Sequence, residues 1–92
     1  MKKIKICGVP YKIKEVDVID EAEDGITQGK IIYSKAKILI KRKLPKELKK
    51  QVIFHEVLHG ILTQLGYSEQ SSDETFVQAV SSAMYQMFEF KE

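Results

Sequence analysis

The stretch that decides the fold runs from Gln51 to Leu65 and reads QVIFHEVLHGILTQL. Apolar residues recur in and around it at the spacing of a helix: Leu48, Val52, Phe54, Val57, Leu58, Ile61, Leu62 and Leu65. This pattern predicts a helix with Pro45 as its first residue and Gly66 as its C-terminal stop. Since more than half of its circumference is apolar, we expect a central helix with the sheet on one side and another helix on the other.

The same stretch contains the pattern H-E-x-x-H, formed by His55, Glu56 and His59. Residues four apart on a helix are offset by about 40° and one turn, so the two imidazoles can converge on one metal ion. Glu56 lies about 100° further round, beside the metal position, where its carboxylate can take a proton from a water that zinc has acidified. The pattern therefore predicts a Zn²⁺ site with two histidine ligands and one glutamate base.

A catalytic zinc ion normally has three protein ligands and a water, so the site needs one more residue. The helical spacing of apolar residues from Phe76 to Phe88 predicts a second helix, with Ser71, Ser72 and Asp73 as candidate caps. Glu74, on its first turn, is the acid best placed to reach the histidines, and Glu69 and Asp73 are weaker candidates. An alternative stays open, because Ser71-x-x-Glu74 is also a capping-box pattern.

Two other zinc patterns do not fit. A metzincin would have glycine and histidine where this chain has Leu62 and Leu65. A peptide deformylase uses an upstream cysteine, but Cys7, the only cysteine, lacks the surrounding pattern of that family and is expected to be a small buried residue. A single cysteine excludes an internal disulfide and is typical of a reducing cytosol.

The N-terminal half predicts strands. Lys3 to Lys14 alternates around Gly8-Val9-Pro10, which indicates a hairpin, and a second strand pair is expected at Lys30 to Tyr33 and Ala36 to Ile40. We therefore expect an α+β fold in which a small antiparallel sheet precedes two helices, within one domain of residues 1–92.

Composition indicates a soluble cytoplasmic protein, with 43% hydrophobic and 30% charged residues, no apolar run of membrane-spanning length and no secretory signal. The net charge of +2 hides an acidic stretch at 15–24 and a basic stretch at 30–50, where nine bases face one acid, Glu47. No aromatic interleaving or base-reading motif accompanies the basic stretch, so we expect solvated faces and neither a nucleic-acid nor a membrane partner. The oligomeric state is not indicated.

From Ala36 to Phe88 the chain resembles the compact gluzincin-type metallopeptidases, closest in organisation to ImmA/IrrE-like and related phage or mobile-element proteins. The motifs that carry the resemblance are His55-Glu56-x-x-His59 and the glutamate on the following helix, Glu74. The resemblance implies zinc bound by His55, His59 and Glu74, with Glu56 as general base and acid in peptide hydrolysis. It also implies a regulatory protein as substrate.

Gln78 departs from the thermolysin-like pattern, which has an aspartate at this position as a partner for a histidine ligand. Tyr85 and Tyr67 are candidate donors to the oxyanion, although each can equally be an ordinary core or surface tyrosine. Few residues follow the second helix, so we expect the peptide substrate to bind by strand addition at 36–40. The competing hypothesis is a non-catalytic zinc-binding adaptor that binds protein or nucleic acid through the basic segment 30–50.

Overall fold

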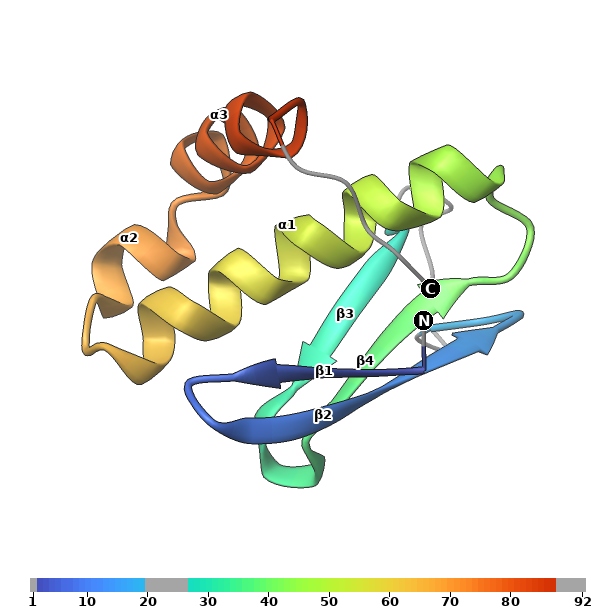
Figure 1. The fold of residues 1–92 in the computed structure, drawn as a ribbon, viewed down its shortest axis with the longest axis horizontal. Coiled ribbons are helices and arrows are strands. Elements are labelled where there is room, and N and C mark those ends of the chain that lie inside the picture. Colours follow the sequence, from blue (N-terminus) through green and yellow to red (C-terminus); the bar gives the residue numbers. More distant parts are fainter. Residues whose placement is uncertain (1, 20–26, 88–92) are drawn as a thin grey trace.

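The computed structural model describes residues 2–19 and 27–87, and its fold is α+β, as the sequence predicts (Figure 1). In these residues a four-stranded sheet is followed by three helices, of which the first packs on the sheet and the other two pack on the first. The elements are β1 (Lys3–Ile6), β2 (Val9–Val16), β3 (Gly29–Ile32), the 3₁₀ turn η1 (Tyr33–Lys35), β4 (Lys37–Lys41), α1 (Lys46–Gln64), α2 (Ser68–Ser72) and α3 (Glu74–Tyr85). No helix among the described residues is both long enough and apolar enough to cross a bilayer.

The strand order is β1-β2-β4-β3, and the sheet is mixed. The predicted hairpins are present, since β1 pairs with β2 and β3 with β4 in antiparallel fashion. The expectation of a wholly antiparallel sheet is wrong where the hairpins meet, because β2 and β4 are parallel. Parallel strands need a crossover connection of about a dozen residues or more, and residues 17–28 supply it. The next strand, β3, lies at the edge of the described sheet, and β4 then pairs between β3 and β2.

This order also corrects the predicted substrate strand. Strand addition at 36–40 needs an unpaired edge, but β4 is paired with β2 on one side and with β3 on the other. The outer strands of the described sheet are β1 and β3.

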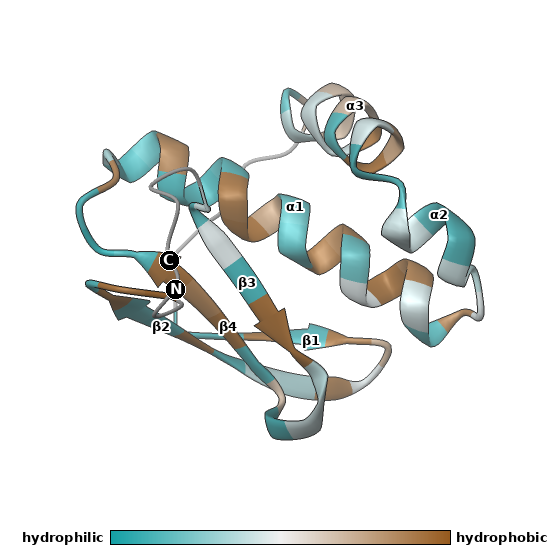
Figure 2. Ribbon diagram, turned by 180° about the vertical axis from the view of Figure 1, so that it is seen from behind, coloured by the Kyte–Doolittle hydropathy of each residue, from teal (hydrophilic) through white to brown (hydrophobic). Residues whose placement is uncertain are grey.

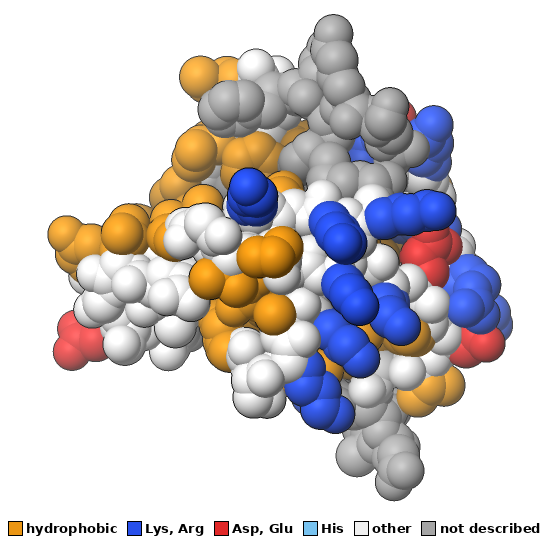
Figure 3. All heavy atoms as spheres, turned by 60° about the horizontal axis from the view of Figure 1, so that its bottom comes forward, with side chains coloured by type: hydrophobic (Ala, Val, Ile, Leu, Met, Phe, Trp, Pro, Cys, Tyr) orange, Lys and Arg blue, Asp and Glu red, His pale blue; other side chains and the backbone are white. Residues whose placement is uncertain are grey.

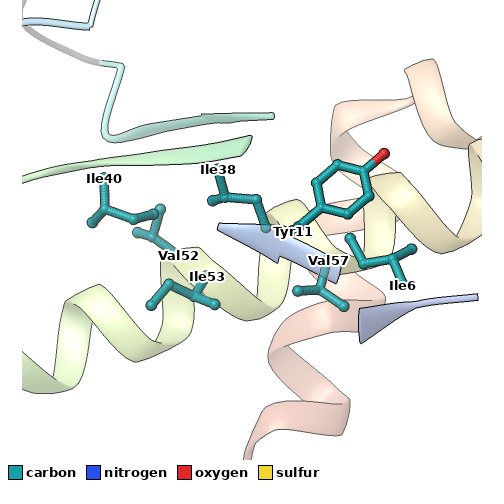
Figure 4. Close-up of a cluster of buried hydrophobic side chains, with 7 residues drawn as sticks. All are labelled: Ile6, Tyr11, Ile38, Ile40, Val52, Ile53 and Val57. Atoms are coloured by element: carbon teal, nitrogen blue, oxygen red, sulfur yellow. The ribbon is translucent and has the colours of Figure 1, made fainter. Parts of the chain in front are cut away.

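One face of the sheet packs on α1, and the residues that alternate toward the helix form the core (Figure 4). The buried side chains of this cluster are Ile6, Tyr11, Ile38, Ile40, Val52, Ile53 and Val57. Figure 2 shows hydrophobic residues interspersed with hydrophilic ones along α1 and the strands. In Figure 1, α1 runs between the sheet and the pair α2 and α3, so the predicted central position of this helix is confirmed.

The ends of α1 follow the sequence signals, with one shift. Pro45 is the residue before the first helical turn and not its first member. Gly66 has φ of 88°, its N–H donates to the carbonyl of Thr63, and the N–H of Tyr67 donates to that of Leu62. These two bonds form a Schellman motif, which ends the helix as predicted.

Cys7 is exposed, so the expectation of a buried cysteine is wrong. It is the first residue of the two-residue β1–β2 turn, with φ of 48°, and Gly8 follows with φ of 86°. A turn with two positive φ angles suits the twist of a hairpin, and this geometry places the cysteine outside the core.

Candidate metal centre

The helix α1 places His55 and His59 one turn apart on the same side. Their Nε2 atoms are 3.2 Å apart, and both side chains are largely buried, with 16% and 14% of their surface exposed. The rings meet edge to face at 68°. The two imidazoles therefore converge as the four-residue spacing predicts.

Glu74 joins them from α3. Its Oε1 atom lies 2.7 Å from Nε2 of His59 and 3.7 Å from Nε2 of His55. The three side chains each offer a ligand atom, and all of these atoms lie within 4.8 Å of one another. The structure thus brings together the three residues that the sequence singles out as metal ligands.

The local backbone explains why the carboxylate of Glu74 is free of a helix-capping role and can face the histidines. The predicted second helix is α3, and Asp73, one of its candidate caps, has an extended backbone that separates it from the short helix α2. Asp73 caps α3, because its Oδ1 accepts a hydrogen bond of 3.0 Å from the N–H of Phe76. Glu74 is then the first helical residue and Ser71 belongs to α2, so the capping-box alternative is wrong. The carboxylate of Glu74 turns toward the histidines instead.

Each histidine has a second contact that orients its ring. Nδ1 of His59 lies 2.6 Å from the carbonyl oxygen of Ser71, so Nδ1 donates and a neutral His59 presents an unprotonated Nε2 to the cluster. His55 hydrogen-bonds with the side chain of Gln78, which supports the partner role expected of that position. Partners of this kind orient the histidine ligands of metal sites.

The geometry fits a metal ion of zinc's size. With metal–nitrogen distances of about 2.0–2.1 Å in a tetrahedral site, neighbouring ligand atoms should be about 3.3 Å apart. The two imidazole nitrogens are 3.2 Å apart, and the distances from Glu74 bracket the same value. Two imidazoles and a carboxylate suit Zn²⁺ and other divalent transition metals.

The pKa of His55 is lowered, first by burial and then by the charge of His59, while Glu74 and Gln78 act in the opposite direction. A lowered pKa keeps this imidazole neutral at physiological pH, which is the form that binds a metal.

Glu56 lies beside the triad and is only 7% exposed. Burial raises the pKa of its carboxyl to about 7, and the negative charge of Glu74 adds to the rise while His59 opposes it. A carboxyl group that titrates near neutral pH is suited to accept a proton and to return it.

Two pockets adjoin these residues, and Gly29, Glu56 and Glu74 line both of them. The first, of about 390 Å³, extends between the start of β3 and Gln78. The second runs along β3 toward α2. The outer strand β3 therefore borders the candidate site along its length.

The predicted oxyanion donors are not brought to the pockets. The hydroxyl of Tyr85 lies 3.5 Å from the carbonyl oxygen of Glu47, its ring packs edge to face on Phe54, and Tyr67 is 54% exposed at the start of α2. Neither residue lines either pocket. The tyrosine that does line the second pocket is Tyr33, whose hydroxyl is 3.0 Å from Oγ1 of Thr63.

Sequence reasoning missed two parts of the site. The carbonyl of Ser71 has no signature in the sequence, because any residue supplies a backbone acceptor. The sequence predicts Tyr33 only as the end of a strand, and the strand order shows that it follows the outer strand β3 beside the candidate site.

No protein-family model matches this sequence, and no curated protein or solved structure is significantly similar to it.

Proposed function

We propose that the protein is a zinc-dependent metallopeptidase whose metal ligands are His55, His59 and Glu74. The observation that carries the proposal is the buried carboxyl of Glu56 beside three convergent ligand atoms. When bound there, Zn²⁺ would lower the pKa of a water molecule and polarise a peptide carbonyl. The resemblance to compact gluzincins agrees with this set of residues.

Glu56 has the role of proton carrier. Its carboxylate accepts a proton from the attacking water and then delivers that proton to the leaving amine. A pKa of about 7 makes both transfers feasible near neutral pH. Ser71 and Gln78 hold the two imidazoles in the orientation that the ligand set requires.

The substrate is proposed to be an extended peptide segment that pairs with the outer edge of β3. This strand borders both pockets, so alternate side chains of a bound peptide can enter them while main-chain groups bond to the strand. The family resemblance favours a regulatory protein in a phage or mobile-element setting as the source of that segment.

The adaptor hypothesis accounts less well for Glu56. A structural zinc site needs no base, and burying an ionisable carboxyl beside it costs folding free energy. The basic segment 30–50 is also divided, since Lys37 lies on the sheet whereas Lys46 and Lys49 lie on α1.

The test uses protein purified without added metal. We expect about one Zn²⁺ per chain by elemental analysis, and cleavage of a fluorescently quenched peptide mixture or labelled casein. Glu56→Gln should keep the metal and lose at least a hundredfold in turnover, whereas His59→Ala should lose both. Equal turnover by Glu56→Gln and the wild type would rule out the peptidase, and protein without metal that cannot be loaded would rule out both metal hypotheses.

A further inference from the structure

The face of the sheet that points away from α1 is covered by lysines from three adjacent strands. Residues such as Tyr11 and Ile38 alternate inward to the core, so their neighbours along each strand point outward. We call this surface the lysine face and define it by Lys3 and Lys5 of β1, Lys12 and Lys14 of β2, and Lys37 of β4. Figure 3 shows basic side chains gathered on this side of the molecule.

The register sets the spacing of these charges. Lys12 is paired directly with Lys3 on one side and with Lys37 on the other, so the three form a row across the sheet. Adjacent strands are about 4.8 Å apart, and same-face residues of one strand are about 7 Å apart. The row is therefore about 10 Å wide, with Lys14 about 7 Å from it. Like charges directly opposite each other destabilise a sheet, so this arrangement has a cost.

No acidic side chain in the described part of the protein neutralises these lysines and relieves their repulsion. None of the five lysines has an ion pair or a side-chain hydrogen bond with any residue in 2–19 or 27–87. Two acids of β2 and the residues that follow it have other partners, since Asp17 pairs with Arg42 and Glu15 with Lys49. Lys30 and Lys41 have further contacts and are not counted in the lysine face.

We propose that the lysine face binds the phosphate backbone of double-stranded nucleic acid. A duplex carries one negative charge per about 1.7 Å of its axis, and lysines that neutralise its phosphates gain affinity by releasing counterions. The face offers no arginine and no exposed aromatic ring, so it lacks the means to read bases or to stack on a single strand. Binding is therefore independent of sequence.

Other anionic partners fit this surface less well. Protein interfaces are depleted in lysine and enriched in arginine and aromatic residues, which the face lacks. Surfaces that bind membranes combine basic residues with exposed large apolar ones. The register also places apolar residues on the lysine face: Leu39 beside Lys14, Ile32 beside Lys37 and Pro10 beside Lys5. The two large ones, Leu39 and Ile32, are half-buried in the sheet.

The test is fluorescence anisotropy with a labelled 20-base-pair DNA of mixed sequence, and the same measurement with duplex RNA tells the two sources of phosphate apart. The triple variant Lys3→Gln, Lys12→Gln, Lys37→Gln should bind at least tenfold more weakly at 50 mM salt. Its slope of log K against log salt should fall by about 3, at about 0.9 per phosphate contact.

The matched control is the triple variant Lys35→Gln, Lys43→Gln, Lys46→Gln, which loses the same charge outside the lysine face and should stay within threefold of wild type. Replacing Lys3, Lys12 and Lys37 by arginine should preserve binding. Glu56→Gln should bind the duplex as the wild type does, so this proposal and the peptidase can fail separately.

Three outcomes would overturn the proposal. Equal losses in the two glutamine triples would assign the binding to net charge alone. Tighter binding to phosphatidylserine vesicles or to polyglutamate, at equal charge concentration, would assign the face to a membrane or an acidic protein. The third is absence of duplex binding by the wild type at 50 mM salt.

Discussion

The Nδ1 atom of His59 lies 2.6 Å from the backbone carbonyl oxygen of Ser71, across the junction between α1 and α2. The side chain of Ser71 fixes this carbonyl, because its buried hydroxyl donates to the carbonyl of His59 and lies 2.8 Å from Oγ1 of Thr63. The ring orientation of one proposed ligand therefore depends on a residue that contacts no metal.

Ser71→Ala should weaken zinc affinity about tenfold, the lower end of the effect of losing such a partner. It should also lower the free energy of unfolding by about 1–2 kcal/mol, since Thr63 and the carbonyl of His59 lose a hydrogen bond. Competition with a chromophoric chelator measures the affinity. The control is Ser72→Ala, because that exposed hydroxyl bonds only within α2; equal affinities for both variants would contradict the positioning role.

Glu74→Gln should reduce zinc affinity by at least tenfold, because a neutral amide replaces the anionic ligand. Glu69→Gln makes the same change at an exposed position of α2 outside the His55, His59 and Glu74 cluster, and should leave the affinity unchanged. An X-ray anomalous map at the zinc edge gives an independent check. Density bonded to both histidines and not to Glu74 would refute this ligand assignment.

The buried carboxyl of Glu56 should make the metal-free protein less stable as pH rises. Its pKa is raised from 4.5 to about 7, so between these values the folded state binds more protons than the unfolded state, and stability falls across that window. Glu56→Gln has no ionisable carboxyl at this position, so its stability should not fall in this way as pH rises. In chelator, the stability of the variant relative to wild type should grow between pH 5 and pH 8 by up to about 3 kcal/mol, from 2.5 pKa units at 1.36 kcal/mol each. Urea melts at both pH values measure it, and parallel pH profiles would contradict it.

Gly60→Ala should destabilise the fold although alanine is the better helix former. A Cβ atom there would lie 2.8 Å from Cδ1 of Ile6 and 3.1 Å from Cδ1 of Ile31. Overpacking costs about 1–3 kcal/mol and exceeds the gain in propensity of about 1 kcal/mol. Chemical denaturation should show a net loss of about 1 kcal/mol. Adding Ile6→Val removes Cδ1, the atom nearest to the new Cβ, so the double variant should recover part of the lost stability. If the losses of the two single variants simply add in the double variant, the clash is not the cause.

Cys7→Asn should stabilise the protein by about 0.5–1 kcal/mol, because asparagine tolerates positive φ better and Asn-Gly favours this hairpin turn. Thermal melts under reducing conditions test the gain. The reverse comparison is Gly8→Ala, which places a Cβ at φ of 86° and should be destabilising. No gain for the asparagine variant would show that the cysteine is not strained.

The sequence predicts the features that depend on residues close together in the chain, such as helix position, helix end and side chains one turn apart. Apolar periodicity located α1, Gly66 marked its end, and the spacing of His55 and His59 predicted their convergence. The candidate cap Asp73 does begin α3, but the sequence does not predict the short helix α2, because its five residues are polar and carry no apolar periodicity.

The parallel pairing of β2 with β4 was missed for a different reason. Strand pairing across a long connection leaves no mark in the alternation of either strand. The position of β3 at the edge of the described sheet, the shared position of the five lysines and the proximity of Tyr33 to the candidate site all depend on that pairing.

The same pairing has a consequence for how the protein folds. The β1–β2 and β3–β4 hairpins can each form from neighbouring residues, but the surface that receives α1 draws Tyr11 from one hairpin and Ile38 and Ile40 from the other. The loop between the hairpins must close before that surface exists, and closing it costs chain entropy before any core contact is gained. Docking of the H-E-x-x-H helix should therefore be a late, rate-limiting event, so the candidate metal centre of a newly made chain should form only after the two hairpins have joined.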